Sequence, residues 1–164
     1  PRHAPATLHR MDLADLAAQE ERLVFTAFDH DTAWTLGEQL VRAARAAALP
    51  VVVSITRGGQ RLFHAALPGT APDNDTWVER KVRVVLRFGH SSLYVGTQAR
   101  AAGSTFEERT GLSLSEYAAH GGSFPIIVRG VGVVGAVTVS GLPQVEDHAF
   151  VVDQLTRFLA QAVS

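Results

Sequence analysis

Apolar residues recur along the chain with two spacings, and together these predict a mixture of helices and strands. Helical spacing predicts helices over 11–22, 32–48, 75–88, 93–102, 114–119 and 143–163. Short apolar runs predict strands over 23–28, 51–57, 61–67, 124–129 and 131–140. Because hairpins make most of the strand connections, we expect an α/β protein of the α+β type. Its central sheet should be mainly antiparallel, with about five strands and flanking helices.

The first hairpin has a clear turn signal. Gly58 and Gly59 stand between two apolar runs, and a type I′ turn needs two residues with positive φ. A two-residue loop at these glycines would place Val53 opposite His64, on the more apolar face of the hairpin. His64 is therefore either a core histidine or a second-rank ligand candidate.

Length and composition limit the class of protein. The chain has 164 residues, which predicts a single domain over 11–164 after a loose N-terminal arm at 1–10. A net charge of −1 argues against a chain-wide nucleic-acid surface. The absence of cysteine excludes disulfides and thiolate chemistry. The sequence has no apolar run of about 18 residues and no apolar leader at its start, so we expect a cytoplasmic protein without membrane contact.

The helix at 75–88 carries the most informative residue. Its apolar arc includes the single lysine of the chain, Lys81, four residues after Trp77. A desolvated ammonium group is costly without a partner. Lys81 therefore either extends along its stem to solvent or points into a pocket that holds an anion. The opposite side of the helix carries Arg80, Arg83 and Arg87, which form a solvated face, a subunit contact or a ligand clamp.

Two further segments carry candidate chemistry. His90 and Ser91 lie where one helix ends and another begins, and the free amides of a helix start can hold an anion. The alternative is a plain polar junction between two helices. His120 precedes Gly121 and Gly122, a pair that lets the backbone approach a ligand or forms a plain tight turn. No two histidines have the short spacing of a metal site, so we predict no metal.

Several segments together resemble a known family. They are FTAFDHDTAW at 25–34, RGGQ at 57–60, FH at 63–64, DNDTW at 73–77, RK at 80–81, RFGHSS at 87–92, HGGSFPI at 120–126, VSGLP at 139–143 and DH at 147–148. This set resembles the uncharacterised-protein-family branch of the heme-degrading domain family, the GlcG/HbpS-like group. The resemblance covers about residues 20–163. It implies a profilin-like fold, assembly into symmetric dimers and higher rings, and a heme-binding or heme-degrading role.

Three functions remain open. The first is a binding protein for an anionic small molecule, either heme or another carboxylated compound. The second is an enzyme that uses His90 or His120 as acid or base and Lys81 as electrophilic support. The third is an oligomeric assembly or adaptor protein. The candidate ligand-binding residues are Lys81, Arg87, His90, Ser91, His120, Gly121, Gly122, His64 and Trp77.

Overall fold

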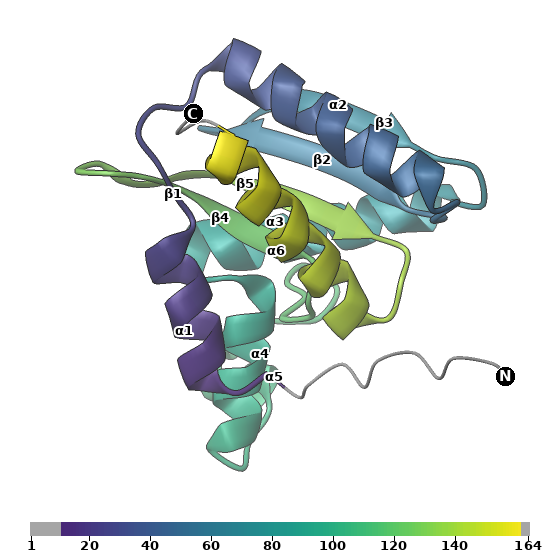
Figure 1. The fold of residues 1–164 in the computed structure, drawn as a ribbon. Coiled ribbons are helices and arrows are strands. Elements are labelled where there is room, and N and C mark those ends of the chain that lie inside the picture. Colours follow the sequence, from purple (N-terminus) through teal and green to yellow (C-terminus); the bar gives the residue numbers. More distant parts are fainter. Residues whose placement is uncertain (1–10, 162–164) are drawn as a thin grey trace, which may run out of the picture.

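A computed structural model describes residues 11–161 of the chain (Figure 1). The expected N-terminal arm at 1–10 and the end of the last predicted helix lie outside this range. The helices are α1 (Leu13–Arg22), α2 (His30–Ala46), α3 (Pro72–Phe88), α4 (Ser92–Ala101), α5 (Phe106–Thr110) and α6 (Gln144–Gln161). The strands are β1 (Val24–Phe25), β2 (Val52–Arg57), β3 (Gln60–Ala66), β4 (Ser123–Val128) and β5 (Gly132–Ser140).

The strands form one five-stranded sheet in the order β1-β4-β5-β2-β3. The β2–β3, β2–β5 and β4–β5 pairs are antiparallel. The short strand β1 instead pairs parallel with β4, which makes the sheet mixed. The expectation of a central sheet of about five strands with flanking helices is confirmed.

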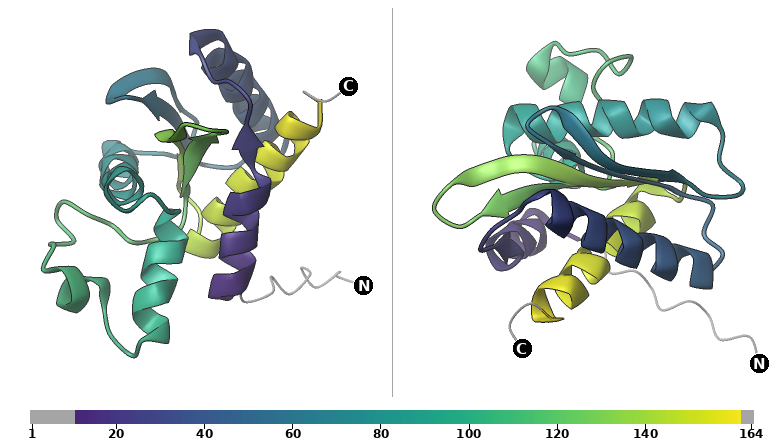
Figure 2. Two further views of the ribbon diagram at one scale, coloured as in Figure 1. Left: turned by 90° about the vertical axis from the view of Figure 1, so that its left-hand side faces the viewer. Right: turned by 90° about the horizontal axis from the view of Figure 1, so that it is seen from above.

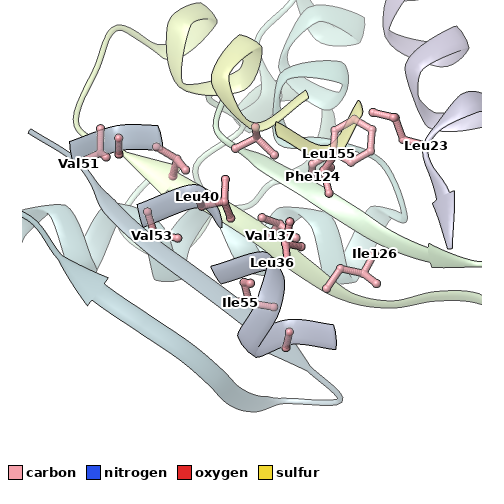
Figure 3. Close-up of a cluster of buried hydrophobic side chains, with 14 of the residues drawn as sticks. Leu23, Leu36, Leu40, Val51, Val53, Ile55, Phe124, Ile126, Val137 and Leu155 are labelled. Atoms are coloured by element: carbon pink, nitrogen blue, oxygen red, sulfur yellow. The ribbon is translucent and has the colours of Figure 1, made fainter. Parts of the chain in front are cut away.

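Helices cover both faces of the sheet (Figure 2). α2 and α6 pack on one face, where Leu36 and Leu40 of α2 meet Val53 of β2 and Val137 of β5 (Figure 3). α3 covers the other face with a smaller apolar cluster: Val78, Val82 and Val85 of α3 with Val52 and Ala136 of the sheet. Burial of apolar surface on both faces stabilises this three-layer arrangement.

The predicted register of the first hairpin is wrong. Ser54 lies opposite His64, and Ile55 lies opposite Phe63. The register shifts between Ile55 and Thr56, so Leu62 has no directly opposite residue. A shift of one residue moves the following side chains to the other face of the sheet. His64 therefore lies on the α3 face, where its Nε2 is 2.8 Å from Asp75 Oδ1, rather than among the apolar residues of β2.

The prediction of a helix at 114–119 is also wrong, because these residues form turns and irregular structure. The short helix of this region is α5, which begins after Thr105, whose side chain accepts a hydrogen bond from Glu108 N. Two arginines of α3 hold the following segment: Arg80 Nη1 donates to Leu114 O, and Arg83 Nη1 donates to Glu116 O. These long-range bonds satisfy carbonyl groups that a helix would have paired internally.

Candidate functional site around Lys81

Lys81 is buried in the middle of the molecule and is paired. Its side chain, only 4% exposed, extends from α3 toward the start of α6. Nζ donates to Asp147 Oδ2 at 3.1 Å and to Val139 O at 3.3 Å. The Asp147 carboxylate also accepts backbone N–H bonds from Gly141 and Leu142, at 3.3 and 3.0 Å. The apolar arc of α3 thus places a cation inside the protein rather than at its surface.

Burial works against both charges of this pair. It lowers the pKa of Lys81 from its ordinary value, and the charge and hydrogen bond of Asp147 oppose that shift. Burial likewise raises the pKa of Asp147, against the charge of Lys81 and the two backbone N–H bonds. Each group therefore depends on the other for its charged state.

A cavity of about 210 Å³ opens beside the ammonium group. Asn74, Trp77, Lys81 and Gln144 are among its lining residues. The oxygen of each side-chain amide is already used, because Asn74 Oδ1 accepts from Ala71 N and Gln144 Oε1 accepts from Gly121 N. The NH₂ groups of both amides are thus the ends left for a ligand. With the third N–H of Lys81, they give the cavity several side-chain donors beside the Asp147 carboxylate, which also lines it.

His120 and Trp77 form one wall of this cavity. Their ring centroids are 5.3 Å apart, and the Arg80 guanidinium lies 4.2 Å from the Trp77 ring centroid. Burial lowers the pKa of His120, and the positive charges of Lys81 and Arg100 lower it further. His120 is therefore a neutral hydrogen-bonding group near pH 7 rather than a second cation.

The two glycines after His120 allow the backbone to approach the ion pair closely. A β-carbon on Gly122 would lie 2.7 Å from Lys81 Nζ, and one on Gly121 would collide with Gln144 O. Gly122 also has φ near +137°, a conformation that L side chains rarely adopt. The paired glycines thus shape the site through their missing side chains.

His90 and Ser91 lie at a separate place, the junction of α1 and α4. His90 Nδ1 is 2.9 Å from Glu20 Oε1, its ring stacks on Tyr94, and its side chain is 46% exposed. Ser91 is the N-cap of α4 and accepts from Tyr94 N. Burial raises the pKa of Glu20, while the charge of His90 lowers it. This junction is outside the residues that line the Lys81 cavity.

Arg87 and His64 are also outside that cavity. Arg87 Nη1 donates to the hydroxyl of Tyr117, and His64 pairs with Asp75. The structure therefore brings Lys81, Trp77 and His120 together beside the glycine pair, and it separates the other candidates from them.

Sequence reasoning missed Asp147, Asn74 and Gln144. Asp147 is 66 positions from Lys81 in the chain, so no local spacing relates the two residues. The available signal was an acidic residue in the first turn of a helix that follows Gly141. A lone buried lysine calls for a carboxylate partner, but the sequence alone does not single out which one.

Within residues 11–161, no three histidine or acidic side chains cluster closely enough to hold a metal ion. None of the helices in the same range combines the length and the apolar character needed to cross a membrane.

Comparisons with known proteins agree on one family. Residues 28–156 match the family model described as haem degrading protein HbpS-like. A UPF0303 protein of Streptomyces coelicolor is 60% identical over 149 residues, which cover 91% of this chain and 94% of that protein.

Two solved structures have similar folds. The crystal structure of Ybr137w protein has a TM-score of 0.86 and 34% identity, covering 94% of this chain and 91% of the other. A structure described as a PduOC:heme complex has a TM-score of 0.65 and 16% identity, covering 80% of this chain and 94% of the other. The match of the family model to most of the chain shows that the protein belongs to the HbpS-like heme-degrading protein family.

Proposed function

We propose that this protein binds a small molecule with a carboxylate group, held in the cavity beside Lys81. The observation that supports this most is a buried ammonium group with two acceptors, Asp147 and Val139, and a third N–H left for a ligand. A carboxylate would accept from this N–H in a charge-assisted hydrogen bond. The NH₂ groups of Asn74 and Gln144 provide further donors around it.

The size of the cavity limits the ligand. A volume of about 210 Å³ is below the ~300–1,000 Å³ of sites for drug-sized ligands, so a small ligand suits this cavity best. Short-chain carboxylic acids fit this size, and the Trp77 ring offers an apolar wall for their carbon chain. We therefore assign short mono- and dicarboxylates as the ligand class.

Isothermal titration calorimetry with propionate and succinate tests this proposal. The wild-type protein should bind at least one of these acids. A Lys81→Met/Asp147→Asn variant should not, because it removes the ammonium group and the facing charge together. Equal binding by both proteins, or binding by neither, would show that Lys81 does not hold a carboxylate.

Heme is the second candidate ligand, supported by the family and by the similarity of the fold to the PduOC:heme complex. The Lys81 cavity is smaller than the ~300–1,000 Å³ usual for sites of larger ligands. The larger cavity beside α1 and α4, about 700 Å³, has no histidine among its described lining residues. An enclosed heme with a histidine ligand therefore fits neither cavity.

A surface heme fits His90 better. Its Nδ1 is held by the buried Glu20 carboxylate, an arrangement that orients an imidazole for binding iron through Nε2. The His90 side chain is 46% exposed, and its Nδ1 is the ring nitrogen that contacts Glu20, so Nε2 is the nitrogen proposed to bind iron. A bound heme would supply redox chemistry, and the chain would contribute the oriented imidazole. Hemin titration followed by absorbance tests this: a His90→Ala variant should lose the Soret shift, and retention of the full shift would reject His90.

We also propose that copies of the chain assemble into a homo-oligomer, the partner expected from the family resemblance. An exposed tryptophan of α2, Trp34, supports this proposal. Multi-angle light scattering measures the mass directly, and a monomeric mass at working concentrations would reject it. An enzymatic role for Lys81 with His90 or His120, and a cytoplasmic location, stay hypotheses.

A further inference from the structure

The outer edge of the sheet at β3 has features that the Lys81 site does not use. β3 is the last strand in the sheet order, with β2 on one side only. Such an edge leaves a row of backbone donors and acceptors without strand partners. From Phe63 to Ala66, the register with β2 is regular, and the segment has no proline and no lysine, arginine or acidic residue. The features that usually prevent pairing at a sheet edge are thus missing there.

α2 lies beside this edge (Figure 1), and residues on one face of the helix border it. Trp34, Glu38, Val41, Arg42 and Arg45 follow helical spacing and share that face. With Phe63, His64 and Ala65 of β3, they line one shallow cavity of about 630 Å³. We call these eight residues the β3 edge.

Trp34 is the largest apolar side chain exposed on the β3 edge. It is 56% exposed, although its ring packs edge-on against Phe63 with centroids 5.3 Å apart. Its Nε1 donates to Glu38 Oε1 at 2.9 Å, which fixes the orientation of the indole ring. Tryptophan and arginine are the residue types that contribute most often to the centre of protein interfaces.

The charged side chains along this face of α2 would pair with those of a second α2 that runs in the opposite direction. Among the α2 residues of the β3 edge, which we call the α2 stripe, Glu38 lies toward the N-terminus of the helix, and Arg42 and Arg45 lie toward its C-terminus. When such a stripe meets an antiparallel copy of itself, Glu38 faces the second copy's Arg42. The second copy's Arg45 then lies near Trp34, where a guanidinium group can pack on the indole ring. A two-fold axis requires this self-complementarity.

We propose that the β3 edge is a two-fold interface between two copies of this chain, in which β3 pairs antiparallel with β3 of the second copy. This inference rests on the proposed assembly and names its surface. The paired edge strands would extend the five-stranded sheet across both copies. The two α2 stripes would meet above that junction and bury Trp34 and Phe63.

Charge reversal on the two halves of the stripe tests the interface. A Glu38→Arg variant and an Arg42→Glu/Arg45→Glu variant each place like charges opposite one another. Each should therefore have half the wild-type mass by sedimentation velocity. An equimolar mixture of the two variants restores opposite charges and should regain the wild-type mass. Glu21→Arg, a reversal at an exposed position of α1, is the matched control and should keep the wild-type mass.

A Trp34→Ala variant tests the apolar part without changing charge. Because Trp34 is exposed, the fold should persist, as circular dichroism will show, while the mass falls by half. A monomeric wild-type protein would reject the assembly itself. An oligomeric wild type whose mass none of these variants changes would reject only the β3 edge, which is then free for a strand from another protein. Failure of the mixture to regain mass would reject the antiparallel two-fold arrangement.

Discussion

Gly122 lies so close to Lys81 that a β-carbon at position 122 would push against the lysine ammonium group. A β-carbon at Gly122 would lie 2.7 Å from Lys81 Nζ and would also collide with Val139 O, the second acceptor of the ammonium group. The start of β4, the end of β5 and α3 therefore meet at a residue without a side chain. This relationship explains why the residue directly before β4 is a glycine.

A Gly122→Ala variant should lower the free energy of unfolding by about 1–3 kcal/mol, because it adds backbone strain and a collision. It should also weaken carboxylate binding, since Nζ must move. Urea denaturation and calorimetry measure the two effects. Gly130→Ala is the control: Gly130 has positive φ but no atom within 4 Å of an added β-carbon. Equal losses in both variants would show that strain alone matters.

Removal of Lys81 alone should be costly. A Lys81→Met variant leaves Asp147 buried without its cation, which typically costs about 3–5 kcal/mol of stability. A Lys81→Met/Asp147→Asn variant should recover most of that loss, because no unpaired charge remains and the amide oxygen still accepts from Leu142 N. Urea denaturation of both variants measures this. A single variant as stable as the wild type would mean that the pair carries little charge in the folded protein.

His148 should make stability depend on pH. Burial lowers its pKa to about 4 from an ordinary 6.5, and its Nε2 lies 2.7 Å from Gln19 Oε1. The unfolded chain binds a proton at a higher pH than the folded one, so stability is full above pH 6.5 and falls as the pH drops toward 4. The loss is about 3 kcal/mol. Urea denaturation at several pH values in this range measures the free energy of unfolding. That free energy should change less with pH for His148→Gln than for the wild type, and an equal change would contradict the assignment.

The Glu20–His90 contact gives a test of surface heme binding that leaves the histidine in place. A Glu20→Gln variant removes the carboxylate that orients the imidazole, a change that typically costs 10–100-fold in affinity at metal sites. Hemin titration should show that weakening. Glu21→Gln changes a neighbouring exposed residue and should bind like the wild type. If the Glu20→Gln variant binds hemin as tightly as the wild type does, then heme binding does not depend on the Glu20–His90 hydrogen bond.

Hydrophobic periodicity predicted the sheet and most helices, and the position of Lys81 in an apolar arc identified the lysine of the site. The register of the first hairpin was not predicted, because the two turn glycines give no sign of the shift between Ile55 and Thr56 that leaves Leu62 without an opposite residue. Asp147 was missed for a related reason: its distance from Lys81 in the chain is spanned by four elements. Local pattern shows that a buried charge needs a partner, and only the fold supplies the partner's identity.

The tryptophan indole N–H signals of ¹⁵N-labelled protein give the most direct test of the central claim. The chain has two tryptophans, so Trp34→Phe assigns both signals. During titration with propionate, the Trp77 signal should shift and saturate, because Trp77 lines the Lys81 cavity, while the Trp34 signal stays in place. In the Lys81→Met/Asp147→Asn variant, neither signal should move. A wild-type Trp77 signal that does not shift, or an equal shift in the variant, would contradict carboxylate binding at Lys81.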